Sequence, residues 1–229
     1  MAIWMARLDG HEFDLRALSE HLRGPDYAVR EMRTSEYYLE ARRFQSLAEA
    51  TAVRDEAIRL IPRINGAARL VNANSKPVAF GGSVISVSEE GRQSVFLFPP
   101  PIAVRAAVAV SIDGETMPRL PTVAETLLAN ADHDQARAEA LHLFGLDQDW
   151  VNLYRTLEAI EQAAGDEQVA TWVSKNKLRR FRHTAGSRRA IGDAARHGPT
   201  NETPPANPMS IDEARTLIRE LMSRLLMIF

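Results

Sequence analysis

The pattern of apolar residues changes near Pro118, and this change constrains the fold more than any other feature of the chain. Before Pro118, β-branched residues cluster between glycines, which is typical of strands. After it, strand signals are absent and apolar residues recur at helical spacing. We therefore expect an α+β protein. Residues 1–118 would form a mixed α/β domain with antiparallel strands, and residues 119–229 an all-helical domain.

Apolar and β-branched runs predict the strands of the first domain. Asp14 is a good N-cap for a helix between the first two strands. The capping box Ser46-Leu47-Ala48-Glu49 predicts the start of a longer helix, which Pro62 should kink or interrupt. A β-bulge is expected at Gly81-Gly82. The expected strands are residues 3–8, 27–32, 36–44, 78–87, 94–98 and 102–112.

The second domain reads as a series of capped helices. Ser174 is expected to cap a basic helix, and Ser187 precedes another that would reach His197. A second capping box, Ser210 to Glu213, predicts a final helix that runs to Phe229. Its broad apolar face should pack either into the domain core or against a second copy of the chain in a homodimer. The other expected helices are residues 122–131, 134–144 and 149–164.

Composition excludes several classes of protein. The chain has no cysteine, which excludes disulfides, thiolate metal sites and cysteine nucleophiles. No apolar run is long enough to cross a membrane, and the N-terminus does not resemble a signal peptide. We therefore expect a cytoplasmic protein without a membrane partner.

The charge is distributed unevenly along the chain. The whole sequence has a formal net charge of −2, but residues 171–198 hold eight cations and one acid, a net charge of +7, which leaves −9 for the rest. Such a segment favours RNA or another anionic partner, unless its arginines pair with acids such as Glu158, Glu161 or Glu167. The candidate nucleic-acid-binding residues are Lys175, Lys177, Arg179, Arg180, Arg182 and Arg188.

The basic segment ends in Arg196-His197-Gly198, which permits two interpretations. Arginine and histidine can cap the C-terminus of a helix that glycine ends. Alternatively, His197 moves a proton in RNA cleavage while Arg196 or Arg189 stabilises the charge that develops on phosphate.

A helical domain that carries arginine followed by histidine-glycine resembles the HEPN superfamily, many of whose members are ribonucleases of defence or toxin systems. The family motif is an arginine, four to six residues and a histidine, whereas seven residues separate Arg189 from His197. The resemblance implies a metal-independent ribonuclease or an RNA-binding protein of the bacterial defence or toxin type, with His197, Arg196 and Arg189 as its candidate catalytic residues.

Other motifs favour no cofactor and no metal. Asp132-His133-Asp134 is a weak metal candidate that more simply opens a helix, and Gly81-Gly82 lacks the lysine of a phosphate-binding loop. Two other hypotheses therefore remain. One is a non-catalytic nucleic-acid- or protein-binding assembly protein that dimerises through its C-terminal helix. The other is a small-molecule enzyme, which no motif in the sequence supports.

Overall fold

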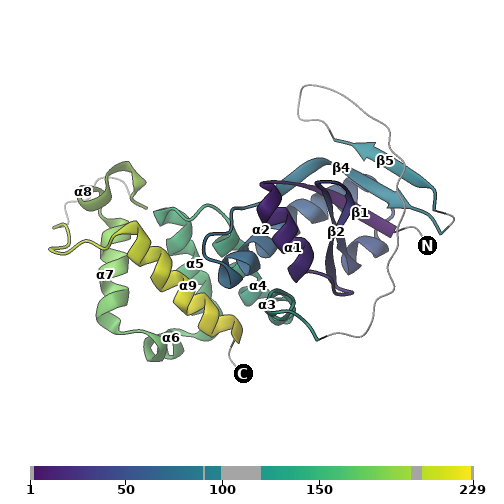
Figure 1. Ribbon diagram of the computed structural model, residues 1–229. Coiled ribbons are helices and arrows are strands. Elements are labelled where there is room, and N and C mark those ends of the chain that lie inside the picture. The colour runs from purple at the N-terminus through teal and green to yellow at the C-terminus, as the bar shows by residue number, and fades with distance from the viewer. Residues whose placement is uncertain (1–2, 90, 99–119, 197–202, 228–229) are drawn as a thin grey trace. The chain divides into compact units, whose positions relative to one another are not determined.

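The computed structural model describes residues 3–89, 91–98, 120–196 and 203–227, and it has the expected α+β fold (Figure 1). The chain divides into two compact units, an N-terminal unit (Met1–Thr126) and a helical unit (Leu127–Phe229). This division falls inside helix α3 (Val123–Asp132), whereas the boundary expected at residue 118 lies outside the described residues.

The N-terminal unit is built on a five-stranded antiparallel sheet in the order β2-β3-β1-β4-β5. Strands β4 and β5 form the expected hairpin, and β1 pairs with both β3 and β4. The register between β1 and β4 shifts opposite Gly81 and Gly82, as expected, and Gly82 has a φ of 78°. The strands are β1 (Ile3–Asp9), β2 (Tyr27–Arg33), β3 (Glu36–Ala41), β4 (Ala79–Val87) and β5 (Gln93–Leu97).

Helix α2 (Ala50–Val71) packs against β1 and β4 and buries an apolar stripe that includes Val53, Leu60 and Ile64. The capping-box prediction was wrong, because Glu49 is the N-cap residue and the Ser46 hydroxyl donates to the Arg43 carbonyl instead. The helix also continues through Pro62 without interruption. Near its end, the buried Asn65 side chain exchanges two 2.9 Å hydrogen bonds with the backbone of Val78, which ties the helix to the chain entering β4.

Two local predictions in the first half of the unit were also wrong. The third strand stops at Ala41, because the chain turns into a 3-10 helix (Arg42–Ser46) that buries Phe44. Helix α1 (Glu12–His21) begins two residues before Asp14 and is capped by His11, whose ring accepts from the Phe13 amide. Asp14 instead lies buried and accepts from the Lys76 amide. The strand expected at residues 102–112 lies outside the described residues.

The helices expected at residues 134–144 and 149–164 lie in the helical unit, and the one expected at residues 122–131 is α3, which the unit boundary divides. The sequence did not predict α6 (Asp166–Trp172). Asp134 and Asp149 cap α4 and α5 by accepting backbone hydrogen bonds from Ala136 and Asn152. The remaining elements are α4 (Gln135–Gly145), α5 (Trp150–Ala164), α7 (Lys175–Gly186), α8 (Arg188–Ile191), a 3-10 turn (Gly192–Ala194) and α9 (Ile211–Met227).

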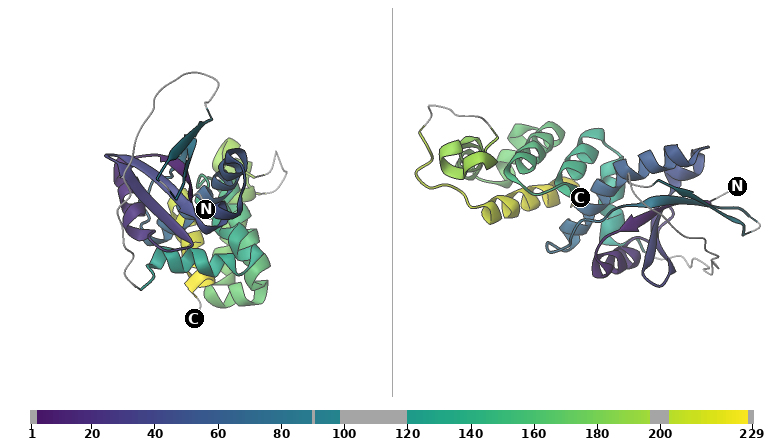
Figure 2. Two further views of the ribbon diagram at one scale, coloured as in Figure 1. Left: turned by 90° about the vertical axis from the view of Figure 1, so that its right-hand side faces the viewer. Right: turned by 90° about the horizontal axis from the view of Figure 1, so that it is seen from above.

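Helix α9, drawn in yellow in Figure 2, packs on α4, α5 and α6. Ser210 and Glu213 form the expected capping box, in which each side chain accepts from the backbone amide of the other. Leu217, Leu221 and Leu225 are buried, so the apolar face of α9 belongs to the core of the helical unit. This face is therefore not available to a second copy. Among the described residues, no helix is both long enough and apolar enough to cross a membrane.

Candidate nucleic-acid interface

The basic segment begins with helix α7, which is anchored by its apolar side. Ser174 caps the helix, as expected, by accepting from the Lys177 amide. Leu178 and Phe181 are buried, and the Phe181 ring lies 6.1 Å from the ring of Tyr154, on which it stacks, and 6.0 Å from that of Trp150. The cations of α7 therefore project from a helix whose position the core of the unit fixes.

Three side chains of α7 hold the segment that leads into α9. The Arg180 guanidinium forms two 3.0 Å hydrogen bonds to the carboxylate of Glu213 and donates to the carbonyls of Asn207 and Pro208, both at 2.9 Å. The His183 ring lies 2.8 Å from the Thr203 carbonyl oxygen, and the buried Thr184 hydroxyl accepts from the Met209 amide. These contacts give α7 a structural task that its charge did not reveal. The pKa of Glu213 is lowered, because Arg180 and the Ser210 amide both donate hydrogen bonds to its charged form.

The segment after α7 differs from its prediction. Helix α8 ends at Ile191 instead of reaching His197, because Gly192 adopts a φ of 65°, in the left-handed region. Arg196 therefore follows a 3-10 turn and is not a cation at a helix C-terminus. His197 lies outside the described residues.

Arg196 docks onto helix α5. Its amide donates to the carbonyl of Ala185, and its guanidinium lies 2.9 Å from a carboxylate oxygen of Glu158. The same guanidinium stands 4.0 Å from the centre of the Tyr154 ring, within the range of a cation–π interaction. Glu158 was named from the sequence as a possible partner of the arginines, whereas Tyr154 was not identified. Their spacing of four residues, which places both on one side of α5, was the available signal.

Glu161 forms the second contact between α5 and the basic segment. Its carboxylate pairs with Arg182. Burial raises the pKa of the Glu161 carboxyl, although the Arg182 charge beside it acts in the opposite direction. Glu158 and Glu161, both named by the sequence as alternative partners of the arginines, thus hold two of them.

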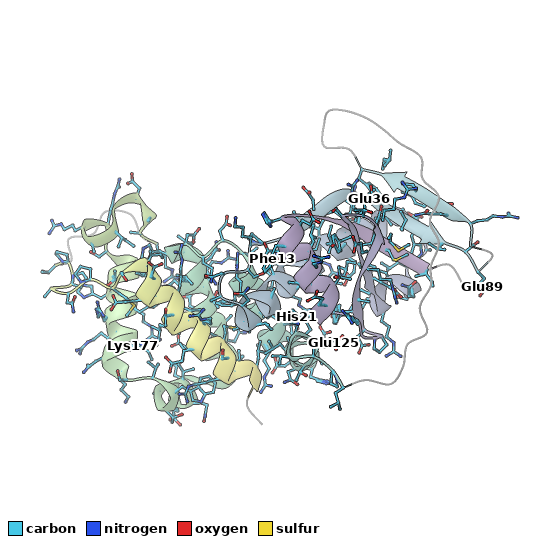
Figure 3. The ribbon with its side chains drawn as sticks, in the orientation of Figure 1. Phe13, His21, Glu36, Glu89, Glu125 and Lys177 are labelled. Atoms are coloured by element: carbon cyan, nitrogen blue, oxygen red, sulfur yellow. The ribbon has the colours of Figure 1, made fainter. Side chains whose placement is uncertain are left out.

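Ion pairs engage most of the predicted nucleic-acid-binding surface. The ammonium group of Lys177, which is labelled in Figure 3, lies 3.5 Å from a carboxylate oxygen of Glu220. Arg188 pairs with Asp193. The five cations of the segment that form ion pairs are Lys177, Arg180, Arg182, Arg188 and Arg196. The helical unit as a whole has 13 Lys and Arg residues and 14 Asp and Glu residues, a formal net charge of −1. The cations of the basic segment therefore do not form one continuous positive surface among the described residues.

Lys175, Arg179 and Arg189 differ from these five, and we call them the open cations. All three are exposed, and none forms an ion pair within the part of the chain that the structure describes. Arg179 donates to the side-chain carbonyl of Asn176 at 3.1 Å, a neutral partner that leaves its charge uncompensated. Lys175 and Arg179 are four residues apart, on one side of α7.

Within the described ranges, no group of three or more His, Asp and Glu residues is placed to hold a metal ion, and Asp134 of the weak metal candidate serves as a helix cap. Comparison with protein-family models, with curated proteins and with solved structures finds no match for this chain.

Proposed function

We propose that the helical unit is a non-catalytic binding module that contacts the backbone of single-stranded RNA through the open cations. The observation that carries this proposal is that, among the described residues, five cations of the basic segment have a carboxylate partner and three exposed ones have none. A phosphate can replace water around Lys175, Arg179 and Arg189, whereas it must compete with a carboxylate at each of the other five.

Three phosphate contacts imply weak binding that depends on salt. Each contact to a single strand releases condensed counterions, so the logarithm of the binding constant should fall with the logarithm of the salt concentration, with a slope of about −2 for three contacts. The eight cations together would give a slope of about −6. The slope therefore measures how many of the cations contact phosphate.

The test is fluorescence anisotropy of a labelled single-stranded RNA over a salt series. The triple variant Lys175→Ala, Arg179→Ala, Arg189→Ala should abolish the binding that salt weakens. A matched control removes three exposed arginines of the N-terminal unit that form no ion pair within the described residues, through Arg7→Ala, Arg16→Ala and Arg23→Ala. Absence of binding at low salt, or an equal loss in the control, would overturn the proposal.

Metal-independent RNA cleavage is the second candidate, and the state of Arg189 favours it. In such cleavage the ribose 2′-hydroxyl attacks the adjacent phosphorus and the bond to the 5′-oxygen breaks, while a histidine moves the proton. An arginine that stabilises the phosphate must have a free guanidinium. Arg189 is exposed and has no carboxylate partner among the described residues, whereas Arg196 is held by Glu158.

Product analysis on the binding samples separates the two candidates. Cleavage that His197→Ala abolishes, with binding retained, would support the ribonuclease. His133→Ala, which changes another histidine of the same unit, should leave cleavage intact. Intact RNA in every bound sample would exclude cleavage and leave the non-catalytic proposal in place.

A further inference from the structure

Strand β5 forms one end of the sheet, and its outer edge pairs with no strand among the described residues (Figure 1). The hydrogen bonds at the two ends of the hairpin show which backbone groups of β5 point toward β4 and which point away from it. The Ser88 amide donates to the Arg92 carbonyl and the Phe98 amide to the Gly82 carbonyl, both at 2.8 Å. Since bonding direction alternates along an antiparallel strand, the amides and carbonyls of Gln93, Val95 and Leu97 point to the outer edge.

The side chains of β5 are exposed on both faces of the sheet. Val95 pairs with Ile85 and lies on one face, where it is 42% exposed, and Leu97 on that face is 61% exposed. Phe96 pairs with Val84 on the opposite face and is 39% exposed. A partner that covers one face would leave the other in water. A strand that continues the sheet would cover part of the β5 side chains on both faces, and it would also bond the outward backbone groups.

The two edges of the sheet differ in charge. Edge strand β2 carries Arg30, Glu31 and Arg33, the kind of residue that discourages a further strand. No charged residue occurs from Gln93 to Phe98 on the β5 side. A partner strand at β5 therefore meets neither charge repulsion nor a buried charge.

We propose that the outer edge of β5 pairs with β5 of a second copy of this chain, so that two sheets join into one across a two-fold axis. An uncharged strand is its own electrostatic complement, which favours a second copy over a charged peptide. An axis at Val95 places Val95 opposite its mate and Gln93 opposite Leu97. All three outward-pointing residues of each copy then find a partner.

The absence of cysteine from the sequence allows a direct test of this register. In the full-length Val95→Cys variant, the two cysteines would face each other with Cα atoms about 5.5 Å apart, which suits a disulfide. Mild oxidation should link two chains, and reduction should separate them. The control is Val151→Cys on α5, because Val151 is 40% exposed and so closely matches Val95 at 42%. Cross-linking that is no faster at residue 95 than at residue 151 would overturn the proposal.

The mass of the unmodified protein in solution provides the second measurement. The wild-type chain should be a dimer that dissociates on dilution. Val95→Lys should shift it to monomer, since two lysines would meet at the axis, and Val151→Lys should not. Hydrogen exchange at the Val95 amide then distinguishes other occupants of the edge. A monomer with fast exchange would leave the edge open to a different protein, and a monomer with slow exchange would place another part of the same chain there. Either result would overturn the proposal.

Discussion

Helix α7 and strand β5 each present a phenylalanine ring, but the two rings lie in opposite environments. Phe181 of α7 is fully buried between two aromatic rings, whereas Phe96 of β5 is partly exposed and contacts only the ring of Trp4 among the described aromatic pairs. The rest of each element follows the same division. Arg180 of α7 is fixed by hydrogen bonds and by an ion pair with Glu213, whereas β5 is held by β4 along one edge. The charged element is thus largely engaged inside its own unit, and the apolar one is left open.

The strongest test of this comparison removes the same ring from each element. Phe181→Ala should lower the free energy of unfolding by about 3–5 kcal/mol, because it leaves a cavity in a packed core. Phe96→Ala should cost about 1 kcal/mol at protein concentrations where the chain is monomeric, since the ring is partly in water. Urea unfolding of the two variants measures both values. Similar losses would mean that β5 is as firmly packed as α7, and the contrast would fail.

A second test compares two neighbouring arginines of α7. Arg180→Ala should destabilise the protein by about 1.5–3 kcal/mol, because it removes hydrogen bonds to the Glu213 carboxylate and to two backbone carbonyls. Arg179→Ala removes the same charge but only a contact to Asn176, so its effect should stay within about 0.5 kcal/mol. Thermal or urea unfolding provides the measurement. Equal effects would show that charge, and not the position of Arg180, determines the contribution.

The sequence predicted the elements better than it predicted the partners of their side chains. Helical periodicity identified α5, because burial repeats along one element and can be read from it. Arg180 donates hydrogen bonds to Asn207 and Glu213, which follow it by 27 and 33 positions in the sequence. No local sequence pattern encodes contacts over such a separation. The end of α8 at Gly192 was missed because the sequence offered a second glycine, Gly198, as an equally good stop.

The pH dependence of stability provides a third and smaller test, with opposite signs at two glutamates. Burial raises the pKa of Glu161 above its usual value of 4.5, so the folded state binds this proton more tightly, and its contribution to stability grows as the pH falls toward 4.5. Hydrogen bonds lower the pKa of Glu213 below 4.5, so its contribution is complete above pH 4.5 and is lost as the pH falls through the folded pKa.

Urea unfolding of Glu161→Gln and Glu213→Gln over a pH series separates these two contributions. The deficit of Glu161→Gln relative to wild type should increase as the pH falls toward 4.5, whereas the deficit of Glu213→Gln should shrink below that pH. A Glu161→Gln deficit that shrinks on acidification would mean that the ion pair with Arg182 outweighs burial.

The smallest effect is expected at Lys177, which tests whether every ion pair of the basic segment contributes equally. Its ammonium group lies 3.5 Å from a carboxylate oxygen of Glu220, and both side chains are partly exposed to water, so Lys177→Ala should change the free energy of unfolding by no more than about 0.5 kcal/mol. Lys175→Ala, which breaks no ion pair, is the matched control. If the two variants unfold alike while Arg180→Ala does not, the ion pairs differ in kind. The ion pair of Arg180, which is accompanied by hydrogen bonds to backbone carbonyls, then stabilises the fold. The ion pair of Lys177 contributes little, so a phosphate can bind this lysine at little cost. A salt slope for RNA binding that becomes shallower in Lys177→Ala would then add this lysine to the open cations.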